Sequence, residues 1–192
     1  MSNEKTARFG TKQIAMTAAL LAVCILSQVF KNLSIFITGP IVNACLILAV
    51  LMVNLPCAII LGIITPITAY IITGGGVMAA VPIIVPFIMM GNIVIVVMTF
   101  FLIKKEMREP KDMIIRIHKY VVAVVSSLAK GVFMGITISL WLLPTFIPEQ
   151  SPLRGKMGVL QTTFSLYQFI TACIGFIYAF LVWSAMKHVN MD

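Results

Sequence analysis

The sequence predicts an all-α membrane protein, a bundle of six transmembrane helices with both termini in the cytoplasm. The 192-residue chain is 60% hydrophobic and only 10% charged, with a mean hydropathy of +1.07. A soluble domain is about 45–50% apolar and about 25% charged. The apolar residues are grouped in six stretches, and most of the cations fall between stretches on one side. Such a chain buries its apolar surface in lipid.

The six apolar stretches are the candidate spans. A spanning helix needs about 20 residues, with a range of about 17–25. The second and third stretches are short and meet at VNLP, and together they are too long for one straight span. Pro56 also suits the first turn of a new helix. One domain, 1–192, therefore contains spans over approximately 11–30, 40–54, 56–73, 81–103, 118–143 and 158–186.

The cations give the orientation. Most of the 14 lysines and arginines precede the first span, lie between the fourth and fifth, or follow the sixth. The positive-inside rule places these segments and both termini in the cytoplasm. The net charge of +8 needs no nucleic-acid partner, because cytoplasmic loops that face anionic lipid account for most of it.

Lys130 lies in the middle of the fifth stretch, where an isolated ammonium costs about 2.5–3.5 kcal/mol or more. All six acidic residues lie outside the six stretches, so no carboxylate within a span is available to pair with Lys130. Three alternatives remain open. The amine pairs with backbone or side-chain oxygens (Ser126, Ser127, or Asn and Gln neighbours), it is neutral, or it pairs with an anionic group of a substrate.

Polar side chains recur at helical spacing in four of the stretches. In the fifth, Ser127, Lys130, Met134, Thr137 and Trp141 share one face. Polar groups are costly against lipid, so such faces are expected to point into the protein or a wet cavity. The spacing of Gly131 and Gly135 indicates close packing of helices.

The polar faces of the second, fourth and sixth stretches contain Asn43, Asn92, and the series Gln161, Ser165 and Gln168. For Asn43, Asn92 and Ser165, packing between helices and contact with a ligand fit equally well. Gln161 and Gln168 lie two turns apart on one face that begins next to an external loop. Their position favours contact with a ligand.

Absent motifs exclude several functions. Without a carboxylate in a span there is no obvious proton or sodium relay, and no Walker motif for ATP hydrolysis is present. The two histidines lack HExxH spacing, no GxSxG occurs, and the four cysteines show no metal-ligand spacing. We expect no enzyme activity, no metal and no cofactor.

Three patches of sequence resemble the substrate-binding S components of energy-coupling factor (ECF) transporters for vitamins and other micronutrients. They are IAMTAALLA, TGPIVNACLILAVLMVNLPCAIILGIITPITAYI and VPFIMMGNIVIV, and in hydropathy the resemblance covers residues 11–187. Small residues at four-residue spacing let another helix approach closely. The first patch is similar to the AxxxA motif by which S components dock on their coupling subunit, and its alanines are Ala15, Ala18, Ala19 and Ala22.

The resemblance implies a high-affinity binding subunit of an ABC importer for a small water-soluble vitamin or precursor, in a bacterial or archaeal plasma membrane. Its implied partners are a transmembrane coupling (T) subunit and two ATP-binding-cassette ATPases. The ligand is then expected in the outer half of the bundle. The implied site residues are Lys31 and Asn32 near a lid, Gly75 in the third loop, and Asn92, Lys130, Gln161, Ser165 and Gln168 as the lining.

A non-transport scaffold of the cell envelope is the alternative, with the polar faces serving only to pack helices together. The two interpretations differ in one feature, because only a transporter needs a ligand-sized pocket that opens outward. The lack of acids within the spans argues against a permanently cationic ligand. Lys130 with amide neighbours suits a small organic anion or a neutral, amide-rich compound.

Overall fold

The structure is a computed structural model, which describes residues 10–30, 35–74, 76–103 and 113–189. Every regular element in these residues is a helix, so the all-α prediction is confirmed for them. The helices are α1 (Thr11–Val29), α2 (Ile35–Met52), α3 (Leu55–Thr73), α4 (Val77–Ala80), α5 (Ile84–Leu102), α6 (Met113–Met134), η2 (Gly135–Leu142), α7 (Leu143–Phe146), η3 (Arg154–Lys156), α8 (Met157–Phe164) and α9 (Leu166–Val189).

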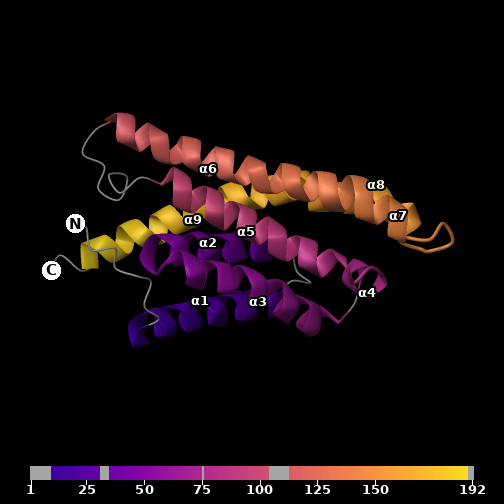
Figure 1. Cartoon of the computed structure of the whole chain (residues 1–192), viewed down its shortest axis with the longest axis horizontal. Helices are drawn as coiled ribbons and strands as arrows, with labels where there is room; N and C mark the ends of the chain where they lie inside the picture. The colour runs from indigo at the N-terminus through magenta and orange to yellow at the C-terminus, as the bar shows by residue number, and fades with distance from the viewer. Residues whose placement is uncertain (1–9, 31–34, 75, 104–112, 190–192) are drawn as a thin grey trace, which may run out of the picture.

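The long helices lie side by side along the long axis of the molecule (Figure 1). The start of α1, the start of α6 and the last turns of α9 lie at one end of the bundle, and α4 and α7 lie at the other (Figure 1). Five helical segments are long and apolar enough to cross a membrane, whereas α2 is shorter. These five segments are Thr11–Val29, Leu55–Thr73, Ile84–Leu102, Ile117–Phe146 and Arg154–Met186.

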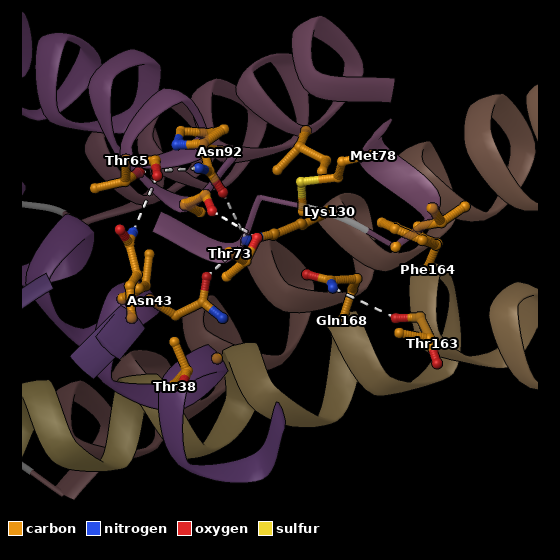
Figure 2. A pocket seen from close by; sticks show the side chains of 18 of the residues that line it. Thr38, Asn43, Thr65, Thr73, Met78, Asn92, Lys130, Thr163, Phe164 and Gln168 are labelled. Carbon is orange, nitrogen blue, oxygen red and sulfur yellow. Dashed lines mark hydrogen bonds between the residues drawn. The ribbon is translucent and has the colours of Figure 1, made fainter. Parts of the chain in front are cut away.

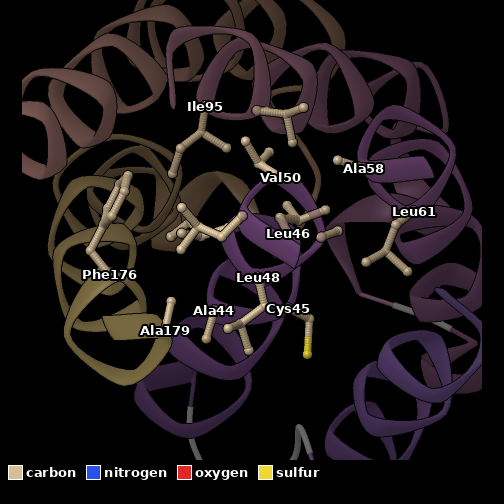
Figure 3. Close-up of a cluster of buried hydrophobic side chains, with 14 of the residues drawn as sticks. Ala44, Cys45, Leu46, Leu48, Val50, Ala58, Leu61, Ile95, Phe176 and Ala179 are labelled. Atoms are coloured by element: carbon tan, nitrogen blue, oxygen red, sulfur yellow. The ribbon is translucent and has the colours of Figure 1, made fainter. Parts of the chain in front are cut away.

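Helix α2 is buried on all sides from Asn43 to Leu51. Every residue from 44 to 51 is at most 6% exposed, and α2 contacts α1, α3, α5 and α9. Figure 3 shows its side chains meeting Leu61 of α3, Ile95 of α5 and Phe176 of α9. A helix that is apolar all round belongs in the interior. This cluster fills the half of the bundle that lies away from α4.

Helix α2 begins at Ile35 rather than near residue 40, and Pro40 lies inside it. The helix is held here by close packing on α9. A Cβ built at Gly175 of α9 would lie 2.6 Å from the Asn43 Cβ and 3.0 Å from the Pro40 carbonyl oxygen. The bare glycine therefore lets the backbones of α2 and α9 approach closely.

Replacing Gly175 with alanine is expected to lower the thermal stability, because the new methyl group has to displace the α2 backbone. Overpacking of this kind costs about 1–3 kcal/mol, and each kcal/mol shifts the unfolding midpoint of a domain of this size by about 2–4 °C. A thermal scan in detergent measures the shift. Gly158→Ala is the matched control, because nothing lies within 4 Å of its added Cβ. Equal midpoints for the two variants would contradict this packing.

The helix that begins with α6 changes to π-helical geometry in η2 and continues into α7. The N–H of Leu143 bonds to the carbonyl of Ile138, five residues back. Pro144 supplies a reason, since it has no N–H to donate to the carbonyl four residues back and its ring clashes there.

Because a π-helix has more residues per turn than an α-helix, the side chains that follow Met134 face other directions than α-helical spacing predicts. Ile138, Ser139 and Leu142 are buried, whereas Trp141 is 53% exposed. The prediction that Trp141 shares the inward face of Lys130 was wrong, because it assumed uninterrupted α-helical spacing.

Candidate functional site

A cavity of about 420 Å³ lies in the half of the bundle that contains α4. Its volume falls within the range of about 300–1,000 Å³ that is usual for small-molecule sites. The apolar part of its wall includes Val42, Pro66, Ala69, Met78 and Phe164. The polar side chains in the wall are Gln28, Thr38, Asn43, Thr65, Thr73, Asn92, Lys130, Thr163 and Gln168.

Lys130 reaches into this cavity from α6 and is only 3% exposed. Its Nζ donates to Asn43 Oδ1 at 2.7 Å and to Asn92 Oδ1 at 2.8 Å, and Figure 2 shows the two asparagines on either side of it. An ammonium has three N–H donors. The third finds no acceptor within hydrogen-bonding distance among the described residues.

Side-chain oxygens therefore provide the contacts of Lys130, as one of the sequence alternatives proposed, and they come from asparagine neighbours, Asn43 and Asn92. The buried hydroxyls of Ser126 and Ser127 have no hydrogen-bond partner among the described residues. Of the acidic residues, only Glu149 lies in the described part of the chain, where it is exposed. An ammonium at Lys130 thus meets amide dipoles and, in the described residues, no carboxylate.

Asn92 is oriented by helix α3. Its Nδ2 donates to the Gly62 carbonyl at 3.1 Å and lies 3.5 Å from Thr65 Oγ1. Gly62 permits this contact, since a Cβ there would be 3.3 Å from the Asn92 Cβ. With its nitrogen bound to α3, Asn92 turns its oxygen toward Lys130.

Gln28 of α1 extends the same hydrogen-bond network along the wall. Its Nε2 donates to the Thr65 carbonyl at 3.0 Å, and its Oε1 accepts from Thr68 Oγ1 at 2.8 Å. Both ends of this amide are therefore engaged by α3, which fixes the position of α1 next to the cavity.

Asn43 differs from these two amides. Its oxygen accepts from Lys130, but its Nδ2 donates to no described residue. The side chain is 2% exposed and lines the cavity. Figure 2 shows it between Lys130 and Thr38.

Three of the predicted lining residues, Lys130, Asn92 and Gln168, line the cavity. Gln168 lies across the cavity from Asn43 (Figure 2), with Nε2 at a long 3.4 Å from the Thr163 carbonyl. Its Oε1 accepts from no described residue.

Gln161 and Ser165, which were also predicted to line the site, are not part of the wall. Gln161 Nε2 donates to the Ser139 carbonyl at 3.0 Å, and Ser139 Oγ donates to the Gln161 carbonyl at 2.8 Å. Ser165 Oγ donates to the Gln161 carbonyl at 2.6 Å, at the break between α8 and α9. The π-helical geometry of η2 turns Ser139 inward. Its two hydrogen bonds with Gln161 then connect η2 to α8.

The remaining predicted residues lie elsewhere. Lys31, Asn32 and Gly75 fall outside the described residues. All four alanines of the predicted docking motif are exposed on α1, and none of them lines the cavity. They are Ala15, Ala18, Ala19 and Ala22.

Several polar residues of the wall were not predicted as site residues from the sequence, among them Gln28, Thr38, Asn43 and Thr65. A signal was present for two of them. Gln28 and Asn43 are amides in otherwise apolar stretches, where an unpaired amide is costly. The threonines gave no signal, because threonine is common in membrane helices as a packing residue.

No group of three or more histidine, cysteine or acidic side chains in the described residues is placed to hold a metal ion. Comparison of the chain with protein-family models, with curated proteins and with solved structures found no match.

Proposed function

We propose that this protein is the substrate-specific, high-affinity binding subunit (S component) of an ECF-type ABC importer for a small water-soluble vitamin or precursor. In this proposal it spans a bacterial or archaeal plasma membrane six times, with both termini in the cytoplasm. The observation that supports it most is the cavity around Lys130, which combines ligand-sized volume, apolar walls and a few convergent polar groups.

The position of the cavity agrees with uptake from outside. The basic segments of the sequence flank the starts of α1 and α6, and these lie at the end of the bundle opposite α4 (Figure 1). If the basic end faces the cytoplasm, the cavity lies in the outer half of the membrane. A scaffold of the cell envelope, the alternative function, has no need of such a cavity.

Helix α1 supplies the surface that we propose for the coupling subunit. Ala15, Ala18, Ala19 and Ala22 are exposed on it, and small side chains allow another membrane helix to approach closely. Transport would then require that coupling subunit and two ATPases, since the chain has no ATP-binding motif of its own.

Uptake by cells tests the proposal. The chain is expressed with the coupling subunit and the two ATPases of its source, and water-soluble metabolites accumulated from rich medium are compared by mass spectrometry. We expect one compound class to accumulate only when all components and active ATPases are present. Accumulation that is unchanged without the ATPases, or no difference from cells that lack the chain, would contradict the importer.

A change in the alanine surface should separate docking from binding. Ala18→Trp is expected to abolish accumulation, because the indole prevents close approach of the coupling subunit, while small-molecule binding by the purified variant stays at the wild-type level. Ala185→Trp, on the exposed part of α9, is the control and should transport normally. Normal uptake by Ala18→Trp would show that docking does not use this face of α1.

A further inference from the structure

Lys130 and Asn43 both have hydrogen-bond donors to spare beside the cavity. As an ammonium, Lys130 keeps one N–H without an acceptor among the described residues, and Asn43 keeps its Nδ2 group; both residues are at least 97% buried and line the cavity. The Asn43 and Asn92 oxygens already accept from Lys130. Buried donors are normally paired, so these two donors are available to an acceptor group of a ligand in the cavity.

The same part of the wall lacks a negative charge. Lys130 faces two amide oxygens, and the only acidic residue in the described part of the chain, Glu149, is exposed. A buried ammonium is strongly destabilising unless it is paired and hydrogen-bonded. An anionic group of a ligand in the cavity would accept from the two spare donors and would supply the missing charge.

The number of donors distinguishes between anions. One N–H of Lys130 and the Asn43 amide match the two oxygens of a carboxylate. A phosphate dianion has more charge and more acceptor oxygens than this pair serves, and phosphate sites use arginine forks or several backbone N–H groups. None of the cavity-lining side chains is an arginine.

The other residues that line the cavity indicate which groups the rest of the ligand contains. The lining also includes apolar side chains, with Pro66, Met78 and Phe164 among them. Across the cavity from Asn43, Gln168 has a long bond to Thr163 and an oxygen that accepts from no described residue. An uncharged polar group of the ligand fits there.

We propose that the cavity binds a small monocarboxylic acid with an apolar middle and a second, uncharged polar group. Lys130 Nζ and Asn43 Nδ2 donate to its carboxylate. The inference rests on the proposed function only in requiring that the cavity takes up a small molecule.

Matched pairs of acids and primary amides test it, because the two members have nearly the same shape and differ in charge. The probes are straight-chain and aromatic monocarboxylates of about four to ten carbons, and each is compared with its own amide. The full-length protein in detergent is heated with each compound at saturating concentration. At least one acid should raise the unfolding midpoint by about 5 °C or more, and its amide should have much less effect.

Asn43→Asp is the decisive variant. The new carboxylate takes the place of the ligand's charge beside Lys130, so the protein should remain folded and the acids should lose their effect. Asn54→Asp is the matched control. Asn54 caps the start of α3 through a 2.8 Å bond from the Cys57 N–H, aspartate is an equally good cap, and the response to acids should be retained.

Two results would overturn the inference and leave the proposed function standing. If the amides stabilise the wild type as strongly as their acids do, the cavity binds small molecules but does not distinguish them by charge. Acids that still stabilise Asn43→Asp would be binding elsewhere. If neither acids nor amides stabilise the wild type, the inference fails, and the accumulation experiment alone decides whether the proposed function holds.

Discussion

Replacing Lys130 with methionine is expected to weaken binding of the natural ligand by about 30- to 4,000-fold and to leave the protein folded. Loss of one partner from a buried, hydrogen-bonded charge pair costs about 2–5 kcal/mol, and each 1.4 kcal/mol is tenfold in affinity. Methionine has a similar length and removes a buried charge that no described carboxylate balances. The fold is therefore expected to tolerate the change.

Isothermal titration with the compound released from the wild-type protein measures this effect. Lys156→Met is the control, because Lys156 is exposed next to α8 and does not line the cavity. Its affinity should equal that of the wild type. An unchanged affinity for Lys130→Met would show that the lysine only binds Asn43 and Asn92.

Replacing Ala69 with tryptophan is expected to abolish binding altogether. Ala69 of α3 lines the cavity, and an indole at this position would occupy space that the ligand needs. Part of that space is empty in the structure, so the cost to stability should stay within the range of about 1–3 kcal/mol that overpacking causes.

The control for size and hydrophobicity is Ala185→Trp, which places the same side chain on an exposed part of α9. It should bind like the wild type. Titration of both variants with the released compound makes the comparison. If Ala69→Trp binds normally, the ligand occupies another part of the molecule.

Much of the fold was predictable because hydropathy depends on local sequence. The boundaries of α1 and α3 lie within a residue or two of those expected from apolar stretches and from Pro56. The boundary of α2 was less accurate. Proline is favoured in the first turn of a helix, but here tertiary packing against Gly175 holds Pro40 within the helix.

Residues of the site were predictable only where a single polar side chain stands in an otherwise apolar stretch. Lys130 and Asn92 stand out because polar groups are costly within a span. The contact between Lys130 and Asn43 joins residues 87 positions apart, and no local period contains it. The packing of α2, α3, α5 and α6 decides which polar side chains meet in the cavity wall.

The hydrogen bonds between Gln161 and Ser139 were not predicted for another reason. The prediction assumed that residues 134–141 continue the α-helix with about 3.6 residues per turn. The chain instead forms a π-helix over Gly135–Leu142. One proline, Pro144, was the available signal. It lies after the segment whose register it changes, and the pattern of apolar residues within 135–142 does not reveal the shift.

Mass spectrometry of the gently purified protein tests the central claim most directly. The wild type and Ala69→Trp are purified in mild detergent from cells grown in rich medium, denatured, and analysed for released small molecules. We predict one small organic acid at near-stoichiometric amount from the wild type and none from Ala69→Trp. The contradicting result is that the two proteins release the same compounds in the same amounts, because then the cavity around Lys130 is not a binding site.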